Sequence, residues 1–128
     1  MYRKALIAGA IFAALAVITG AFGAHALKAV LPEQQLLVFE TGARYQFYHS
    51  FALLITGIAY FSFPHKYLKI ATNLFIIGIL FFSGSLYVLP FLVNAGIKPG
   101  LAGIITPIGG LLLIAGWISL LAGIIRNK

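Results

Sequence analysis

Four long apolar segments occupy most of the chain, and they restrict its fold more than any other feature of the sequence. Each has about the length that an α-helix needs to cross a hydrocarbon core roughly 30 Å thick, and none contains Asp, Glu, Lys or Arg. We therefore predict an all-α protein, a four-helix transmembrane bundle that forms a single domain over residues 1–128. The expected helices cover residues 5–24, 45–63, 70–92 and 101–125.

The composition excludes an ordinary soluble domain. Hydrophobic residues make up 62% of the chain and charged residues 9%, against about 45–50% and about 25% in soluble proteins. The net charge of +7 does not indicate a nucleic-acid partner, because the basic residues lie at the ends of the apolar segments and form no stripe that could follow phosphates. Cysteine is absent, which excludes disulfides, thiolate metal sites and cysteine nucleophiles.

The basic residues also predict an orientation in the membrane. If all four segments cross, one side carries six basic residues and the other three: Arg3, Lys4, Lys66, Lys69, Arg126 and Lys128 against Lys28, Arg44 and Lys98. The excess favours a multi-pass protein of the cytoplasmic (inner) cell membrane with both termini in the cytoplasm. A signal peptide cleaved near residues 24–26 (Ala-His-Ala) is the alternative for the first segment. The length of that segment, a full span, favours an uncleaved helix.

Small residues recur at helical spacing in the first and last segments. Gly9 and Ala13, then Ala16 and Gly20, are four-spaced pairs in the first segment. Glycines recur every seven residues in the last: Gly109, Gly116 and Gly123. Because small residues let helices approach closely in a bilayer, we expect these to be packing positions. The pattern leaves open whether they serve contacts within the bundle or between subunits.

Two stretches depart from the simple pattern of four spans. We expect residues 27–44 to form an amphipathic segment on the outer surface. Its helical part would begin at Pro32, and the chain would bend into the second span at Gly42. In the fourth span, Pro107 removes one backbone hydrogen bond. We expect either a kink there, with residues 101–105 buried against the bundle, or a helix that starts at Pro107 with Thr106 as its cap.

Polar residues within and beside the apolar segments are the only candidates for chemistry, because such side chains normally face the interior of a bundle. The candidate cluster consists of His25, Glu40, Arg44, Tyr45, His49, Ser83, Ser85 and Tyr87. A metal or proton site made by His25, His49 and Glu40 is one hypothesis. However, Glu40 and His49 are nine residues apart, about 13 Å in rise along a continuous helix.

The favoured interpretation of these residues is structural. His49 would form a hydrogen bond with Tyr87 or a serine, His25 would cap a helix end, and Trp117 would be a packing aromatic. No nucleophile, phosphate loop or dinucleotide fingerprint is present. We therefore predict no catalytic residue, no metal and no cofactor.

Four motifs resemble an uncharacterised membrane family, the domain of unknown function 423, which includes the eukaryotic transmembrane protein 256. They are residues 20–25 (Gly-Ala-Phe-Gly-Ala-His), 39–49 (Phe-Glu-Thr-Gly-Ala-Arg-Tyr-Gln-Phe-Tyr-His), 82–87 (Phe-Ser-Gly-Ser-Leu-Tyr) and 106–110 (Thr-Pro-Ile-Gly-Gly), the last followed by Gly-Trp at 116–117. The resemblance covers nearly the whole chain. It implies a small four-helix membrane protein of bacterial type, and it implies no activity.

Three functional hypotheses remain. The leading one is a non-enzymatic accessory or homo-oligomerising subunit that acts through helix packing, with the lipid bilayer and a second copy or a larger membrane complex as its partners. The alternative is binding or transport of a small molecule or lipid at a polar site around His49, aided by the break near Pro107. The third is an intramembrane enzyme that uses His49, His25, Glu40 and Arg44.

Overall fold

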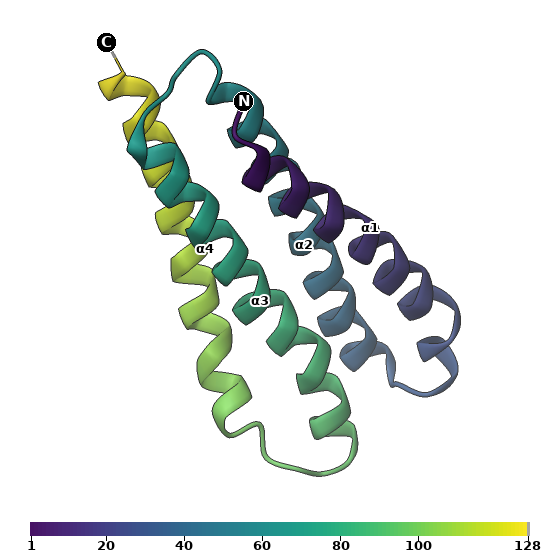
Figure 1. Ribbon diagram of the computed structural model, residues 1–128. Helices are drawn as coiled ribbons and strands as arrows, with labels where there is room; N and C mark the ends of the chain where they lie inside the picture. Colours follow the sequence, from purple (N-terminus) through teal and green to yellow (C-terminus); the bar gives the residue numbers. More distant parts are fainter. Residues whose placement is uncertain (128) are drawn as a thin grey trace.

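The chain forms four long helices connected by short turns. A computed structural model describes residues 1–127 (Figure 1). A single 3-10 turn, η1 (Leu27–Ala29), lies between the first two helices. The helices are α1 (Arg3–His25), α2 (Glu33–Ala59), α3 (Lys66–Asn94) and α4 (Leu101–Arg126).

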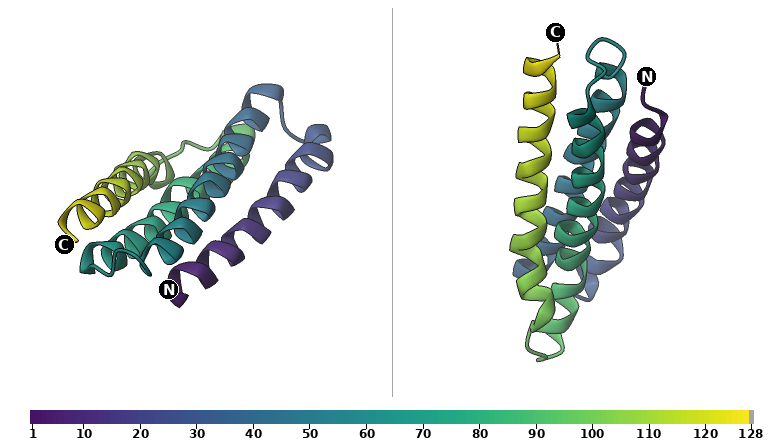
Figure 2. Two further views of the ribbon diagram at one scale, coloured as in Figure 1. Left: turned by 90° about the horizontal axis from the view of Figure 1, so that it is seen from above. Right: turned by 60° about the vertical axis from the view of Figure 1, so that its left-hand side comes forward.

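The helices run alternately up and down and form an open, curved layer. α1 packs on α2, α2 on α3, and α3 on α4. Seen along the layer, α1 and α4 lie at opposite sides, with α2 and α3 between them (Figure 2). The N-terminus, the connection between α2 and α3, and the C-terminal end of α4 therefore lie at one end of the molecule (Figure 1). Lys128, counted above among the basic residues, lies outside the described residues.

Three of the four helices are long and apolar enough to cross a membrane: α1 continued through η1, α3 and α4. α2 is not in this set, because it carries polar side chains along its whole length. Those of Gln46, His49, Ser50 and Thr56 are buried against the neighbouring helices. α2 therefore lies between α1 and α3 in the layer and buries these polar side chains against its neighbours, whereas α1 and α4 bury few residues and expose most of their apolar surface.

The main core lies where α3 meets α2 and α4. Phe75, Leu68 and Ile79 of α3 pack there with Leu53 of α2 and Leu113 of α4. A second, smaller cluster lies at the opposite end from the termini, where the chain turns from α1 into α2. It contains Leu27, Leu31, Leu36 and Phe39. This cluster fixes the start of α2 against the end of α1.

Four of the five glycines expected at packing positions lie at close helix contacts within the chain. A Cβ atom on Gly109 would collide with the backbone of Phe82, and one on Gly116 would lie 2.7 Å from the Phe75 ring. Gly123 packs on Leu68, and a Cβ on Gly9 would lie 2.9 Å from the carbonyl oxygen of Ser50. In contrast, a Cβ on Gly20 would meet nothing within 4 Å.

The expected bend at Gly42 does not occur. α2 is one helix from Glu33 to Ala59, twelve residues longer at its start than the span of residues 45–63. Residues 27–44 accordingly do not form a separate segment but are divided between η1 and α2. The reason lies in the packing of Gly42, which is buried in the contact with α3, where a Cβ would lie only 3.0–3.2 Å from Tyr87, Leu86 and Ser83. The glycine allows this close approach of α3, and α2 continues through it without a break.

The fourth helix begins at Leu101 and continues through Pro107, so a start at Pro107 is wrong. The expected burial of residues 101–105 is also wrong, since Leu101 is 72% and Ile104 59% exposed. The helix tolerates the proline near its beginning because only one intrahelical bond is lost there. The hydroxyl of Thr106 donates to the carbonyl of Ala102 at 3.1 Å and holds the same turn.

Candidate functional site

His49 of α2 contacts Trp117 of α4, and both of its ring nitrogens are engaged. Nδ1 donates to the carbonyl oxygen of Tyr45 at 2.7 Å. The indole Nε1–H of Trp117 donates to Nε2 at 3.0 Å. Because a carbonyl only accepts and an indole only donates, this pair of bonds requires the neutral imidazole with its proton on Nδ1. The Phe75 ring, 5.8 Å away, closes the site from α3.

A groove of about 400 Å³ opens beside His49. Its walls are mostly apolar and come from three helices: Tyr45, His49, Phe82, Gly110, Leu113, Ile114 and Trp117. The His49 ring is 6% exposed and has no nitrogen left for a ligand. The groove therefore resembles a lipid-facing crevice more than a polar binding site.

A second hydrogen-bonded node joins three helices around Gln46. The Tyr87 hydroxyl of α3 donates to Gln46 Oε1 at 2.6 Å, and Gln46 Nε2 donates to the carbonyl oxygen of Phe12 in α1 at 2.8 Å. Thr19 Oγ1 of α1 lies 3.3 Å from the Tyr87 hydroxyl. Polar bonds of this kind hold helices together in a bilayer, where lipid offers no competing partner.

The two serines on either side of Gly84 bond α3 to the helices on both of its sides. Ser83 Oγ donates to the carbonyl oxygen of Gly42 in α2 at 2.7 Å. Ser85 Oγ lies 2.6 Å from Thr106 Oγ1 of α4 and donates to the Phe82 carbonyl of its own helix at 2.8 Å. α3 is thus bonded to α2 through one serine and to α4 through the other.

The eight residues of the expected cluster do not converge on one site. His49 pairs with Trp117 and Tyr87 with Gln46, so the expected bond from His49 to Tyr87 or a serine is wrong. His25 is exposed at the end of α1. Within residues 1–127, no three His, Cys, Asp or Glu side chains are close enough to hold a metal ion together, and His25, Glu40 and His49 are thus not a metal triad in this fold.

Glu40 and Arg44 line a different surface, a groove of about 500 Å³ between α1 and α2. We call it the α1–α2 groove. Its other lining residues are Ala16, Val17, Gly20, Ala21, Ala43 and Phe47. The two charged residues are one helical turn apart on α2, whereas α1 contributes small side chains and so leaves the space open.

The two residues that complete the hydrogen-bonded nodes, Gln46 and Trp117, were missing from the expected cluster. For Gln46 a signal existed, since it lies three and four positions before His49 and Ser50 and so shares their helix face. Trp117 gave no comparable signal. It is 68 residues from His49, and the exposed part of its ring fits an ordinary interface aromatic.

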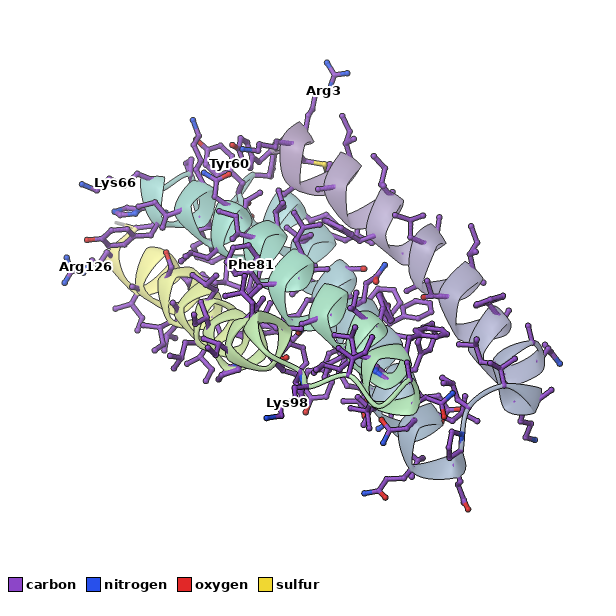
Figure 3. The ribbon with its side chains drawn as sticks, turned by 90° about the horizontal axis from the view of Figure 1, so that it is seen from below. Arg3, Tyr60, Lys66, Phe81, Lys98 and Arg126 are labelled. Carbon is purple, nitrogen blue, oxygen red and sulfur yellow. The ribbon has the colours of Figure 1, made fainter. Side chains whose placement is uncertain are left out.

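Basic and aromatic side chains gather at the end that holds the termini. Lys4 Nζ donates to Asn73 Oδ1 at 2.5 Å, and the ammonium of Lys69 lies 5.6 and 5.5 Å from the ring centres of Tyr2 and Tyr60. Arg3, Lys66 and Arg126 extend outward from the helices at this end, whereas Lys98 extends from the α3–α4 connection at the opposite end (Figures 1 and 3). Aromatic rings with lysine and arginine are typical of a membrane–water boundary.

Comparisons with known proteins identify one family of uncharacterised membrane proteins. The family model described as "Protein of unknown function (DUF423)" matches residues 19–110. A UPF0382 membrane protein of Staphylococcus aureus (strain bovine RF122 / ET3-1) is 47% identical over 116 residues, 91% of this chain and 90% of the relative. A UPF0382 membrane protein of Haemophilus influenzae is 38% identical over the whole chain and 98% of its own length. One of Bacillus subtilis is 36% identical over 94% of this chain and 95% of the relative. No solved structure is similar to this chain.

Proposed function

The chain belongs to the DUF423 family, whose curated relatives are named membrane proteins, and from that premise we propose that it is a non-enzymatic membrane protein that self-associates through helix packing. The observation that carries the proposal is Gly84 on α3. This glycine is flanked by serines that bind α2 and α4, yet a Cβ on Gly84 itself would meet nothing within 4 Å. Gly84 therefore leaves the backbone of α3 open to another helix, and no other helix within residues 1–127 packs against it.

The surface around Gly84 has the shape that a helix from a second copy needs. Leu80, Gly84 and Val88 follow one another at four-residue spacing, and we call them the Gly84 face. Leu80 and Val88 are exposed. Grooves of about 380 and 240 Å³ border the face on either side, towards α4 and towards α1. A small residue between two larger exposed ones lets helices pack closely in a bilayer.

The hydrogen bonding supports a packing role over a catalytic one. Among residues 1–127, no buried side-chain nitrogen or oxygen lacks a partner. The polar groups at membrane depth, such as His49, Gln46 and Ser83, are used to join helices. A catalytic group needs an atom directed at its substrate, and these side chains have theirs directed at their neighbours.

The proposal includes the orientation. We propose that all four helices cross the cytoplasmic membrane and that both termini face the cytoplasm, with the basic end described above on that side. The crossing of α2 is supported by the burial of Gln46, His49, Ser50 and Thr56 against the neighbouring helices. Its first two turns, from Glu33, extend past the hydrocarbon core and lie at the outer interface as an amphipathic extension.

The experiment that tests the proposal measures self-association in liposomes. Because the chain has no cysteine, a single Lys98→Cys site can carry donor and acceptor dyes for energy transfer on dilution with lipid. Gly84→Leu should weaken association at least about tenfold, which corresponds to about 1.4 kcal/mol. Gly20→Leu is the matched control, since Gly20 is equally open but lies on α1.

Two outcomes would contradict the proposal. One is a protein that shows no energy transfer at any lipid dilution and is therefore monomeric. The other is association that survives Gly84→Leu but is lost in Gly20→Leu, which would place the contact on the α1–α2 groove instead.

A further inference from the structure

We propose that the α1–α2 groove is a phospholipid site that selects a headgroup carrying a primary amine, as in phosphatidylethanolamine. This goes beyond the proposed self-association and does not depend on the Gly84 face, but it rests on the proposed crossing of α2. It rests on the placement of four charged residues, on the depth of the groove in the bilayer, and on the order in which the charges occur along the membrane normal.

The two acidic side chains of the protein lie together in this region. A protein with nine Lys and Arg residues has just two acids, Glu33 and Glu40. Both line a groove of about 360 Å³ at the start of α2, with Lys28, Leu31, Leu36 and Leu37. Glu40 also lines the α1–α2 groove, together with Arg44. The two grooves therefore share Glu40 as a common wall, with Arg44 on one side of it and Glu33 and Lys28 on the other.

The contacts at the cytoplasmic end place these charges at the outer boundary. Lys69 contacts Tyr60 at the end of α2, which marks one surface of the hydrocarbon core. A core roughly 30 Å thick spans about 20 helical residues, so the opposite surface falls close to Glu40. Arg44 then lies about 6 Å inside the core, at a rise of 1.5 Å per residue. On α1, the same count from Lys4 reaches the end of the helix near His25.

An arginine at that depth needs an anionic partner, because a guanidinium facing hydrocarbon alone is costly. Arg44 is exposed, and the groove beside it is open. The nearest anion that a bilayer supplies is a lipid phosphate, and guanidinium and phosphate match each other in geometry and charge. The walls formed by Ala16, Val17 and Phe47 would then contact the upper part of an acyl chain.

The order of the charges selects the headgroup. In phosphatidylethanolamine the phosphate lies deeper in the bilayer and the ammonium lies further out. On α2 the cation Arg44 lies deeper and the anion Glu40 lies one turn, about 6 Å, further out. That separation is comparable with the distance between the two charges of an extended phosphoethanolamine group. Glu33 adds a second carboxylate on the outer side, and Lys28 balances part of this negative charge.

Other headgroups fit the same charges less well. A trimethylated amine, as in phosphatidylcholine, keeps the positive charge but has no N–H to donate to Glu40. A glycerol headgroup leaves the lipid with a net negative charge opposite two carboxylates. Because hydrogen bonds to charged groups are the stronger class, the loss of one such bond predicts a preference of about tenfold for the primary amine.

The test measures lipid retention by native mass spectrometry of the purified protein. The probes are phosphatidylethanolamine, phosphatidylcholine and phosphatidylglycerol with identical acyl chains, and soluble phosphoethanolamine as a separate arm. The native chain should retain phosphatidylethanolamine about tenfold better than phosphatidylcholine. Arg44→Gln should reduce retention of all three lipids, whereas Glu40→Gln should remove only the preference for the amine.

Controls separate this site from general lipid adhesion and from the proposed self-association. Lys98→Gln removes a cation on the same side of the membrane but outside the grooves, and Gly84→Leu alters the other proposed contact. Neither should change the preference. Gly20→Leu, which fills the groove, should abolish it. Arg44 is exposed, so helicity and the unfolding midpoint of Arg44→Gln should match those of the native chain.

Several results would overturn the inference. Equal retention of the three lipids would do so, as would a preference for phosphatidylglycerol or a preference that survives Glu40→Gln. Binding of soluble phosphoethanolamine without binding of the lipid would point to a water-soluble ligand. Conversion of a dimer to a monomer by Gly20→Leu, with no change in lipid retention, would assign the groove to a second copy of the chain.

Discussion

Trp117 on α4 and His49 on α2 are joined by a hydrogen bond of 3.0 Å from the indole Nε1 to the imidazole Nε2. This bond is the main polar link between two helices that otherwise contact each other little, since α4 packs almost entirely on α3. It closes the layer locally over Phe75, whose ring centre lies 5.2 Å from that of Trp117. The bond therefore connects α4, at one side of the layer, directly to α2.

The strength of this bond can be measured with a double-mutant cycle. Trp117→Phe and His49→Leu each leave one polar group without its partner, and the double variant removes both. We expect a coupling energy of about 1 kcal/mol, the range found for hydrogen bonds between membrane helices. The measurement is the free energy of unfolding in mixed micelles titrated with a denaturing detergent.

The matched control combines Trp117→Phe with Thr41→Val. The Thr41 hydroxyl bonds only within α2, to the carbonyl of Leu37, so the two changes should be additive. A coupling between Trp117 and His49 that is indistinguishable from this control would mean that the bond adds nothing to stability.

A second prediction concerns the glycines of α4. Gly109→Ala places a Cβ against the backbone of Phe82, and backbone atoms cannot move aside as a side-chain end can. We expect destabilisation by about 1–3 kcal/mol, as for other overpacked sites. Gly20→Ala, where the Cβ meets nothing within 4 Å, should be neutral or slightly stabilising. Thermal unfolding in detergent compares the two, and equal midpoints would contradict the packing described here.

Much of the fold could be predicted because a bilayer allows few solutions. An apolar run of about 20 residues has to be helical to satisfy its backbone, and so the presence and order of four helices follow from their lengths. The start of α2 could not be found in this way. Its first turns carry Glu33, Glu40 and Arg44, and their polarity indicated a separate surface segment. In the structure the same residues continue the helix, since Leu36 and Phe39 pack with Leu27 and Leu31 of the connection between α1 and α2.

The candidate site was less predictable for a different reason. Polar side chains inside an apolar span are expected to face the interior of the protein, and His49 and Ser83 were placed in the candidate cluster on that basis. Partners on other helices depend on the rotation and height of each helix, which periodicity does not specify. The roles of Gln46 and Trp117 as hydrogen-bond partners are therefore seen only in the three-dimensional structure. The glycines show the same limit, because spacing alone did not distinguish Gly9, which contacts α2, from Gly20, which contacts nothing.

The third prediction tests the crossing of α2, the helix whose polar residues set it apart from the other three. Single cysteines in place of Lys28, Lys66 or Lys98 lie in the three connections or next to them, and the native chain gives no background because it has no cysteine. A membrane-impermeant maleimide should label Lys28→Cys and Lys98→Cys in intact spheroplasts. Lys66→Cys should react only after permeabilisation, because its side is held in the cytoplasm by the basic residues. If Lys28→Cys and Lys66→Cys reacted from the same side, α2 would not cross, and Arg44 would lie at the surface without needing a lipid phosphate.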